Sequence, residues 1–204
     1  MLSYRTVKPH TLELLKALAK QPELSETRLV GGTSLALQYG HRSSIDLDFF
    51  GNVSADTPEL EKMLCKLGEV KTLGQNKNVK TFMLDGVKLD IVNYDYPWID
   101  APVVEDEIVL ASTKDIAALK INAIEGRGTK KDFIDVYALL QHYTLKEILT
   151  FYKQKYSTHS LFRALLSLSY FDDADPQMMP TMYIPETWDV MKRYIIEEVD
   201  RFEE

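Results

Sequence analysis

The sequence of 204 residues predicts an α/β (α+β) fold, in which a mixed sheet with flanking helices precedes a C-terminal helical region. Residues 45–50 alternate between apolar and polar side chains, which is typical of a half-buried strand. Asp85-Gly86 separates two further alternating segments and is a strong signal for a β-hairpin. After Pro102 the spacing of apolar residues becomes mostly helical. These observations favour a core with a mixed sheet over residues 1–110 and a helical region over residues 111–204.

The first part is expected to alternate between helices and strands. Pro9 stands at a first-turn position, and Leu12, Leu15 and Leu18 follow at helical spacing. Asp56-Thr57-Pro58 has the composition of a helix start. In chain order we expect a helix over 9–20, a strand over 27–30, a turn at Gly31-Gly32, a helix over 33–39, a strand over 45–50, a helix over 56–67, a weak strand over 70–73 and hairpin strands over 79–84 and 87–93.

The second part is expected to be helical after one short extended segment. Ser112 or Thr113 is a helix cap, and Gly126-Arg127-Gly128 interrupts the helical pattern. We expect an extended segment over 108–110, helices over 113–125, 130–142, 145–155 and 160–171, a loop over 172–185 and a last helix over 186–201.

Composition excludes several classes of protein. The content of 45% hydrophobic and 27% charged residues is that of a globular domain rather than a disordered or fibrous chain. No apolar run is long enough for a membrane span or a signal peptide, so we expect a cytoplasmic protein without a membrane partner. The single cysteine, Cys65, and four histidines without metal-ligand spacing argue against a disulfide framework and a zinc site.

The net charge of −7 is concentrated at the end of the chain. Residues 172–204 hold ten of the 31 acidic residues and three of the 24 basic residues, so the preceding part is neutral overall. A neutral body still permits a local basic patch for phosphates. The acidic tail is interpreted as a self-covering segment or a docking surface for a partner.

Three aspartates form the candidate metal site. Asp46 and Asp48 lie two residues apart on an expected strand, so both side chains face one side while Ile45, Leu47 and Phe49 are expected to enter the core. Asp90, between Leu89 and Ile91, occupies the same kind of position on the second hairpin strand. Two carboxylates about 4 Å apart repel each other by about 4 kcal/mol at an effective dielectric constant of about 20. A converging trio therefore needs a cation, and Mg²⁺ suits carboxylate oxygens.

The segment Gly31-Gly32-Thr33-Ser34 is the candidate phosphate-binding element. Glycines at a strand-to-helix turn permit close backbone approach, and a helix N-terminus presents amide donors to an anion. The segment lacks the Gly-Lys-Ser/Thr ending of a Walker loop and the spacing of a dinucleotide-binding fingerprint. A tight turn without a ligand is the alternative interpretation.

These motifs together carry a family resemblance. Val30-Gly31-Gly32, followed after thirteen residues by Asp46-Leu47-Asp48-Phe49 and later by Asp90, resembles the signature of the DNA polymerase β-like nucleotidyltransferases. The segments 31–37 and 42–50 are similar to those of the AbiEii/MenT nucleotidyltransferase toxins of toxin–antitoxin and phage-abortive systems. Lys120 and the segment 127–135 resemble the downstream lysine and basic-aspartate motifs of that family. The likeness extends from about Leu29 to Leu140.

The resemblance implies magnesium-dependent transfer of a nucleotide from an NTP to an acceptor hydroxyl, with pyrophosphate as leaving group. In this interpretation the acceptor is tRNA, the chain is the toxin of a toxin–antitoxin system, and the partner is a cognate antitoxin. The NTP is expected to lie between the core and the helical region. Fold-level resemblance indicates a reaction class more strongly than an acceptor. A protein or small-molecule acceptor, and a catalytically silent NTP-binding or partner-binding module, therefore stay open as alternatives.

The resemblance and the residue chemistry together give a set of candidate site residues. The expected catalytic residues are Asp46, Asp48, Asp90, Lys120 and Asp132, of which Asp46, Asp48 and Asp90 bind the metal. The expected nucleotide-binding residues are Gly31, Gly32, Thr33, Ser34, Arg42, Ser44, Lys120, Arg127 and Lys131.

Several of these residues have a structural alternative. On a helical wheel Lys120 lies among Ile116, Leu119 and Ala123, so its ammonium is expected either to extend to solvent or to reach an anion. Arg42 and Ser44 bind phosphate, orient the aspartates or belong to an ordinary loop. Arg127 is a candidate phosphate clamp, and Asp132 is expected to orient Lys120.

Two further expectations concern surface lysines. Lys131 and Asp135, four residues apart, form either part of the site or a surface ion pair. A tRNA-binding enzyme would also show a basic strip, for which the candidates are Lys66, Lys71, Lys77, Lys80, Lys130 and Lys131.

Overall fold

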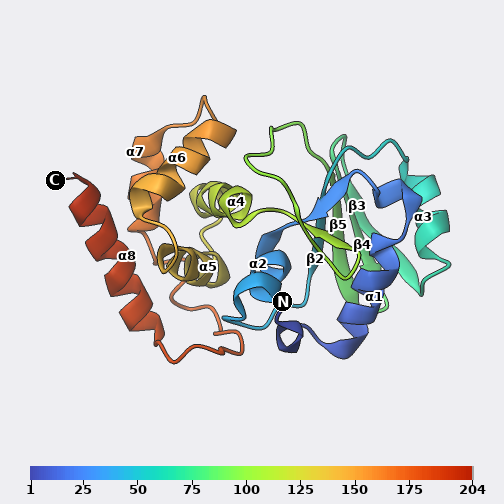
Figure 1. The fold of residues 1–204 in the computed structure, drawn as a ribbon, viewed down its shortest axis with the longest axis horizontal. Coiled ribbons are helices and arrows are strands. Elements are labelled where there is room, and N and C mark those ends of the chain that lie inside the picture. Colours follow the sequence, from blue (N-terminus) through green and yellow to red (C-terminus); the bar gives the residue numbers. More distant parts are fainter. Residues whose placement is uncertain (204) are drawn as a thin grey trace. The chain divides into compact units, whose positions relative to one another are not determined.

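The computed structural model describes residues 1–203 and divides into two compact units (Figure 1). The sheet unit comprises Met1–Asp95 and Pro102–Ala111, and the helical unit comprises Tyr96–Ala101 and Ser112–Glu204. Within the described residues, no helix combines the length and the apolar composition that crossing a membrane requires.

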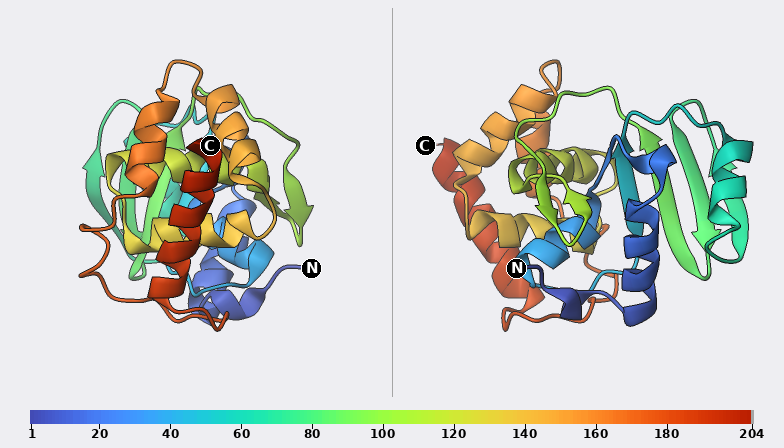
Figure 2. Two further views of the ribbon diagram at one scale, coloured as in Figure 1. Left: turned by 90° about the vertical axis from the view of Figure 1, so that its left-hand side faces the viewer. Right: turned by 45° about the vertical axis from the view of Figure 1, so that its right-hand side comes forward.

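The sheet unit contains a seven-stranded mixed sheet in the order β3-β4-β5-β2-β1-β7-β6. Its strands are β1 (Thr27–Leu29), β2 (Leu47–Gly51), β3 (Val70–Gln75), β4 (Val79–Leu84), β5 (Val87–Asn93), β6 (Val103–Glu105) and β7 (Ile108–Leu110). Its helices are α1 (Pro9–Ala19), α2 (Gly31–Tyr39) and α3 (Thr57–Leu64), with short 3₁₀ turns at Tyr4–Thr6 and Pro22–Leu24. The predicted α/β class is therefore confirmed, and Figure 2 shows the β4–β5 hairpin beside β3.

The hydrophobic core of this unit lies on one face of the sheet. Leu47 and Phe49 of β2 and Leu89 and Ile91 of β5 are buried together with apolar residues of α1 and α3. Because side chains alternate along a strand, the residues between them point to the opposite face. That opposite face carries the polar residues of β2 and β5.

The structure differs from the sequence prediction at three places in this unit. The second strand begins at Leu47 rather than Ile45, and Ile45 is 48% exposed instead of entering the core. Gly31-Gly32 is not a separate turn, because both glycines are the first residues of α2. The strand β6 lies where the sequence predicted no element.

The helical unit consists of α4 (Thr113–Gly126), α5 (Lys130–Leu140), α6 (Leu145–Lys155), α7 (Leu161–Leu168) and α8 (Trp188–Glu203). The last helix packs on α5, α6 and α7, as both figures show. The expected helices are present with small shifts at their ends, and the expected loop precedes α8.

A fully buried ion pair holds the segment Tyr96–Ala101 within the helical unit. Lys155 Nζ lies 2.8 Å from Asp115 Oδ1, and both side chains have no exposed surface. Asp115 also accepts from the backbone N–H groups of Ile99 (2.8 Å) and Asp100 (3.3 Å). Lys155 also donates to the carbonyl oxygen of Pro97. These contacts fix a stretch of chain that has no helix or strand of its own.

Candidate active site

The carboxylates of β2 and β5 lie side by side on the polar face of the sheet. The two strands are parallel, with Asp48 directly opposite Asp90 in the register. Residues opposite each other on neighbouring strands point to the same face, so both carboxylates share one side of the sheet. Both residues are half-buried, whereas Leu47, Phe49 and Leu89 on either side of them are buried. On each strand, alternate apolar residues are therefore buried in the core, and the aspartate between them lies on the polar outer face.

Asp90 is held by two donors. Thr81, its partner in the β4–β5 register, donates its hydroxyl to Asp90 Oδ1 at 2.6 Å. Lys88 donates its ammonium to Asp90 Oδ2 at 2.5 Å. Burial lowers the pKa of Lys88, but the hydrogen bond and charge of Asp90, and then the charges of Asp48 and Asp46, raise it above its ordinary value. All three candidate carboxylates therefore act on one ammonium group.

Asp46 lies just before β2, in a segment attached to the start of α2. The buried Thr33 hydroxyl is hydrogen-bonded to the Ser44 hydroxyl at 2.8 Å, and the backbone carbonyl of Asp46 also accepts from Thr33. Ser44 N–H donates to the carbonyl of Thr6 at 2.8 Å. Thr33 thus couples the first turn of α2 to the backbone that carries Asp46.

The two glycines at the start of α2 leave room for site residues. Gly31 has φ +68°, and a Cβ atom there would come within 2.5 Å of Asp48 Oδ2. A Cβ atom on Gly32 would collide with the guanidinium of Arg42, which is 2% exposed. The backbone N–H groups of a first helical turn have no acceptor within the helix. The glycines therefore keep this N-terminus close to both a carboxylate and a guanidinium.

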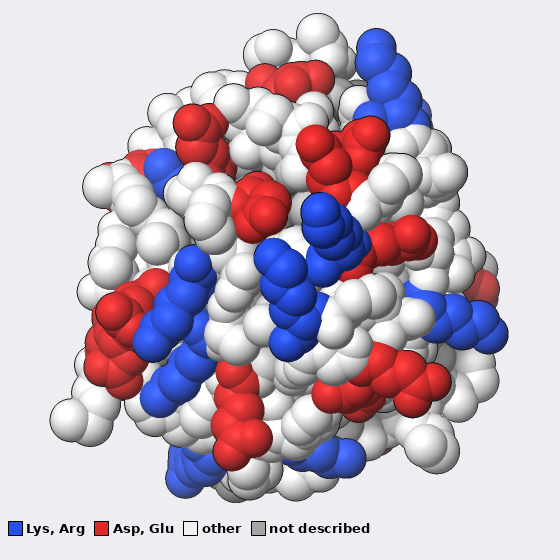
Figure 3. Space-filling model, turned by 90° about the vertical axis from the view of Figure 1, so that its right-hand side faces the viewer, with Lys and Arg blue, Asp and Glu red and all other residues white. Residues whose placement is uncertain are grey.

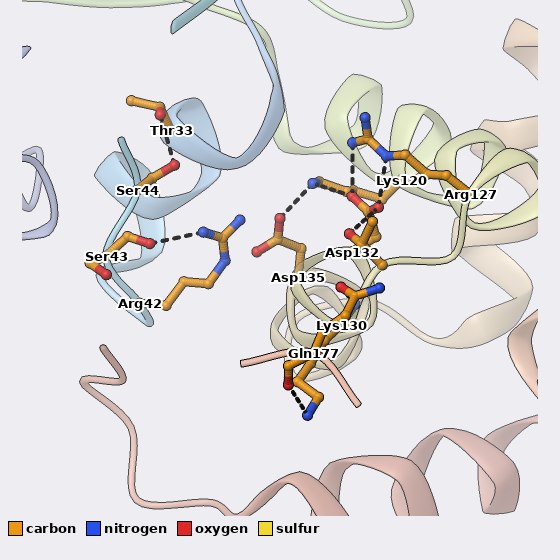
Figure 4. Close-up of polar contacts among 11 residues, drawn as sticks. Thr33, Arg42, Ser43, Ser44, Lys120, Arg127, Lys130, Asp132, Asp135 and Gln177 are labelled. Carbon is orange, nitrogen blue, oxygen red and sulfur yellow. Dashed lines mark hydrogen bonds and ion pairs between the residues drawn. The ribbon is translucent and has the colours of Figure 1, made fainter. Parts of the chain in front are cut away.

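Arg42 and Ser34 are both buried at this end of α2. Arg42 Nη1 donates to the backbone carbonyl of Ser43 at 2.9 Å, as Figure 4 shows. Ser34 is fully buried, and its hydroxyl accepts from Gln38 at 3.2 Å. Arg42 thus adds a positive charge near the N-terminus of α2. The side chain of Ser34 instead makes a hydrogen bond inside the unit.

The donor set suits a magnesium ion that is completed by substrate. Among residues 1–203, no three His, Cys, Asp or Glu side chains are gathered closely enough to ligate one ion. Mg²⁺ in phosphoryl-transfer sites is held by one or two carboxylates, with water and substrate phosphates supplying the other ligands. Asp48 and Asp90 provide two adjacent carboxylates, and Lys88 already places a cation against Asp90. The residues present therefore fit the metal that the fold family implies.

The helical unit carries a second group of predicted residues, centred on Lys120. Its ammonium is buried and lies 2.9 Å from Asp132 Oδ1 and 2.6 Å from Asp135 Oδ2 (Figure 4). Arg127 binds Asp132 from the other side, with Nε 3.0 Å from Oδ2. The Thr129 hydroxyl donates to the same Oδ2 at 2.6 Å. The expected link between Lys120 and an anion is present, and the anions are two aspartates of α5.

The charges around Asp132 control its ionisation. Burial would raise the pKa of Asp132, but the charge of Lys120, the hydrogen bond and charge of Arg127 and the hydrogen bond from Thr129 hold it well below its ordinary value. Asp132 is therefore ionised throughout the neutral range.

Two surface expectations in the helical unit need correction. Asp135 is fully buried against Lys120, so it forms no surface ion pair with Lys131, which is exposed. Lys130 is 5% exposed, and its ammonium donates to the carbonyl oxygens of Asp175 and Gln177. Lys130 therefore fixes the loop before α8 and cannot belong to a basic strip.

The proposed basic strip is also not evident on the sheet unit. Lys66, Lys71 and Lys77 are exposed, whereas Lys80 is half-buried and donates to the carbonyl of Ala55. Figure 3 shows acidic and basic side chains interspersed on the face that it draws. A single-sign area for nucleic acid is absent from that face.

Sequence reasoning missed Lys88 and Thr81. Lys88 stands two residues before Asp90 on the same strand, so the rule that alternate residues share a face was enough to place it beside Asp90. Predicting that Thr81 lies opposite Asp90 requires the register of the hairpin. The Asp85-Gly86 turn determines that register once the turn type is assumed.

Comparisons with known proteins show the family of the chain. The family model of the nucleotidyl transferase AbiEii toxin of type IV toxin–antitoxin systems matches residues 13–204. The uncharacterized protein aq_aa25 of Aquifex aeolicus (strain VF5) is 33% identical, and the match covers 96% of this chain and 99% of that protein.

Solved structures share the fold at lower identity. The crystal structure of JHP933 from Helicobacter pylori matches with a TM-score of 0.54 and 19% identity, covering 97% of this chain and 96% of that one. The structure of ANT(2")-Ia in complex with adenylyl-2"-tobramycin matches with a TM-score of 0.57 and 15% identity, covering 75% of this chain and all of that one. The chain adopts the polymerase β-like nucleotidyltransferase fold and belongs to the AbiEii nucleotidyltransferase toxin family.

Proposed function

We propose that this nucleotidyltransferase transfers a nucleotide from an NTP to an acceptor hydroxyl of tRNA in a Mg²⁺-dependent reaction in the cytoplasm. The observation that carries the proposal is the in-register pair Asp48 and Asp90, which faces away from the core while Gly31 leaves space for Asp48 at a helix N-terminus. A polyphosphate suits this arrangement because amide donors and cations bind its oxygens.

The chemical step is an in-line displacement. The acceptor oxygen attacks the α-phosphorus, the bond from that phosphorus to the oxygen bridging to the β-phosphate breaks, and pyrophosphate leaves. Asp90, oriented by Thr81, takes the proton of the acceptor hydroxyl. Asp48 and Asp90 would hold Mg²⁺ together with substrate oxygens, with Asp46 as the further predicted ligand, and the ion would stabilise charge on the attacking and leaving oxygens.

The remaining predicted residues are assigned to binding and orientation. Gly31, Gly32 and Thr33 offer backbone donors to phosphate, and Ser34 extends the same helix turn. Arg42 and Ser44 bind phosphate or orient the aspartates. Lys120, Arg127 and Lys131 are assigned to neutralising phosphate charge, and Asp132 orients Lys120 and Arg127, with which it already pairs.

The biological proposal follows the family. Members of a toxin–antitoxin family act against the cell that makes them, so we expect expression to be toxic, an antitoxin to relieve the toxicity, and the pair to serve in phage defence. The acidic residues 172–204 remain a candidate surface for the partner.

The experiment is to incubate the protein with each labelled NTP, Mg²⁺ and three acceptor pools: total tRNA, total protein and a set of small hydroxyl compounds. We expect label in tRNA from one or two NTPs, and no label after chelation of the metal. The double variant Asp46→Asn/Asp48→Asn gives the background. Label in protein or in small molecules instead of tRNA would show that the acceptor is of another class. No label from the wild type in any pool would overturn the proposal.

A further inference from the structure

Lys88 is a cation that lies against the candidate metal ligands. Its ammonium is 2.5 Å from Asp90 Oδ2, and Asp48 lies opposite Asp90 in the register of β2 and β5. The side chain of Asp90 is 18% exposed, whereas that of Lys88 is 45% exposed. A flexible four-carbon stem carries the ammonium, so it can leave the carboxylate without moving the strand.

The position of Lys88 is not required by the packing of the sheet. Lys88 alternates with the buried residues Val87 and Leu89, so its stem lies on the polar face and fills no part of the core. Opposite it on β4 stands Met83, which carries no charge. Within the described residues, Asp90 is the hydrogen-bond partner that the contacts assign to this ammonium.

From these contacts we infer that Lys88 is the resident counter-ion of the metal site, which a divalent metal must displace and which then binds the polyphosphate of the NTP. The inference depends on the proposed function. Asp48 and Asp90 are like charges on one face, and an ammonium beside Asp90 offsets part of their repulsion while the metal is absent. The same ammonium competes with a metal that arrives alone. A metal that arrives with an NTP brings both new ligand oxygens and an anion for the displaced lysine. Lys88 is therefore a positioning residue that favours joint binding of metal and nucleotide.

The test compares the variant Lys88→Met with the wild type in nucleotide-free calorimetry with Mg²⁺ and Mn²⁺. We expect Lys88→Met to bind the metal about tenfold more tightly, which corresponds to about 1.4 kcal/mol. We also expect its Tm without metal to fall, and its rise in Tm on adding metal to exceed that of the wild type. In transfer assays its KM for NTP should rise more than its kcat falls.

Two variants serve as controls. Lys88→Arg keeps the positive charge and should bind metal like the wild type. Lys114→Met removes a lysine that pairs with Asp100 at 2.8 Å in the helical unit, and it should leave metal binding unchanged. If Lys88→Met does not fold, the test uses ¹⁵N NMR of the lysine ammonium groups in the wild type. The Lys88 signal is assigned as the one that is missing in Lys88→Arg. The Lys88 signal should then shift on addition of Mg²⁺ but not of Na⁺ at equal ionic strength.

The outcomes separate this inference from the proposed function. If the wild type binds metal and transfers nucleotide while Lys88→Met binds metal no more tightly, the inference is wrong and the proposed function stands. An unmoved Lys88 signal on metal binding has the same meaning. If the wild type neither binds metal nor transfers nucleotide, the proposed function fails and the inference fails with it.

Discussion

The carboxylates of the sheet unit and those of the helical unit differ in how their charge is balanced. On the sheet, Asp90 of β5 pairs with Lys88 on a partly exposed face, and Asp48 of β2 lies opposite Asp90. In the helical unit, Asp132 and Asp135 are buried with Lys120, and Arg127 completes the balance. Asp115 is likewise paired with Lys155. Buried charges are tolerated when they are paired, whereas a partly exposed pair can open without leaving a buried charge behind. We therefore predict ligand binding for the sheet unit's carboxylates and a structural contribution from those of the helical unit.

The strongest test of this comparison is Asp48→Asn. Transfer of labelled nucleotide should fall by about 1,000-fold or more, because a metal-binding charge is lost from the transition state. The free energy of unfolding should change much less than in a variant that breaks a fully buried ion pair, because Asp48 is only half-buried. Chemical denaturation and the transfer assay provide the two measurements, with the exposed Asp95→Asn as control. Full activity of Asp48→Asn would refute the assignment.

Lys155→Met should show the opposite behaviour. It leaves Asp115 buried without its cation, and loss of one partner of a buried ion pair costs about 3–5 kcal/mol. Urea denaturation measures the loss, and adding Asp115→Asn should recover part of it. Lys114→Met, which removes an exposed lysine next to the same helix start, should change stability little. Equal stability of Lys155→Met and the wild type would contradict a structural role for this pair.

Gly31→Ala should have an intermediate effect. The positive φ of +68° costs an alanine about 1–2 kcal/mol, and the new Cβ displaces the carboxylate of Asp48. A displacement of this kind is expected to reduce transfer by about 10- to 100-fold. Gly74→Ala is the matched control, because a Cβ there meets no atom within 4 Å. Transfer by Gly31→Ala at the wild-type rate would show that the position of Asp48 is not critical.

The smallest expected effect concerns acid stability. The pKa of Asp132 is lower in the folded protein than its ordinary value of 3.8, so the folded state binds protons less readily there than the unfolded chain. Its contribution to stability is complete above the unfolded pKa and is lost as the pH falls toward the folded pKa. In urea denaturation, Asp132→Asn should therefore lose less stability than the wild type as the pH is lowered from about 5 to 2. Asp189→Asn, which removes a carboxylate that is 89% exposed on α8, is the control. Parallel pH profiles for Asp132→Asn and the wild type would contradict the assigned pairing.

Local signals in the sequence predicted much of the sheet unit. The strands 79–84 and 87–93 match to the residue, because Asp85 and Gly86 both adopt the positive φ that a two-residue hairpin turn requires. Alternation also predicted that Asp48 and Asp90 face away from the core. It failed at Ile45, because strand pairing begins only at Leu47 and nothing in the alternation marks that start.

The helical unit shows what the sequence did not predict. The position of Lys120 among apolar residues indicated that it needs a partner, but its choice of both Asp132 and Asp135 depends on how α5 packs against α4. The burial of Lys130 by the loop at Asp175 and Gln177 is likewise a long-range contact. Spacing within one helix gave the wrong partner for Asp135, since a pattern four residues apart says nothing of a second helix.

The anchoring of the loop before α8 affects how the chain can be shortened. Lys192 and the Trp188 indole both bind Asp175, and Met191, Ile195 and Val199 of α8 are buried. A chain that ends at Asp172 would lack α8 and would expose the apolar surface that α8 covers. It would also leave the ammonium of Lys130 without the carbonyl oxygens of Asp175 and Gln177. Such a fragment should collect in inclusion bodies.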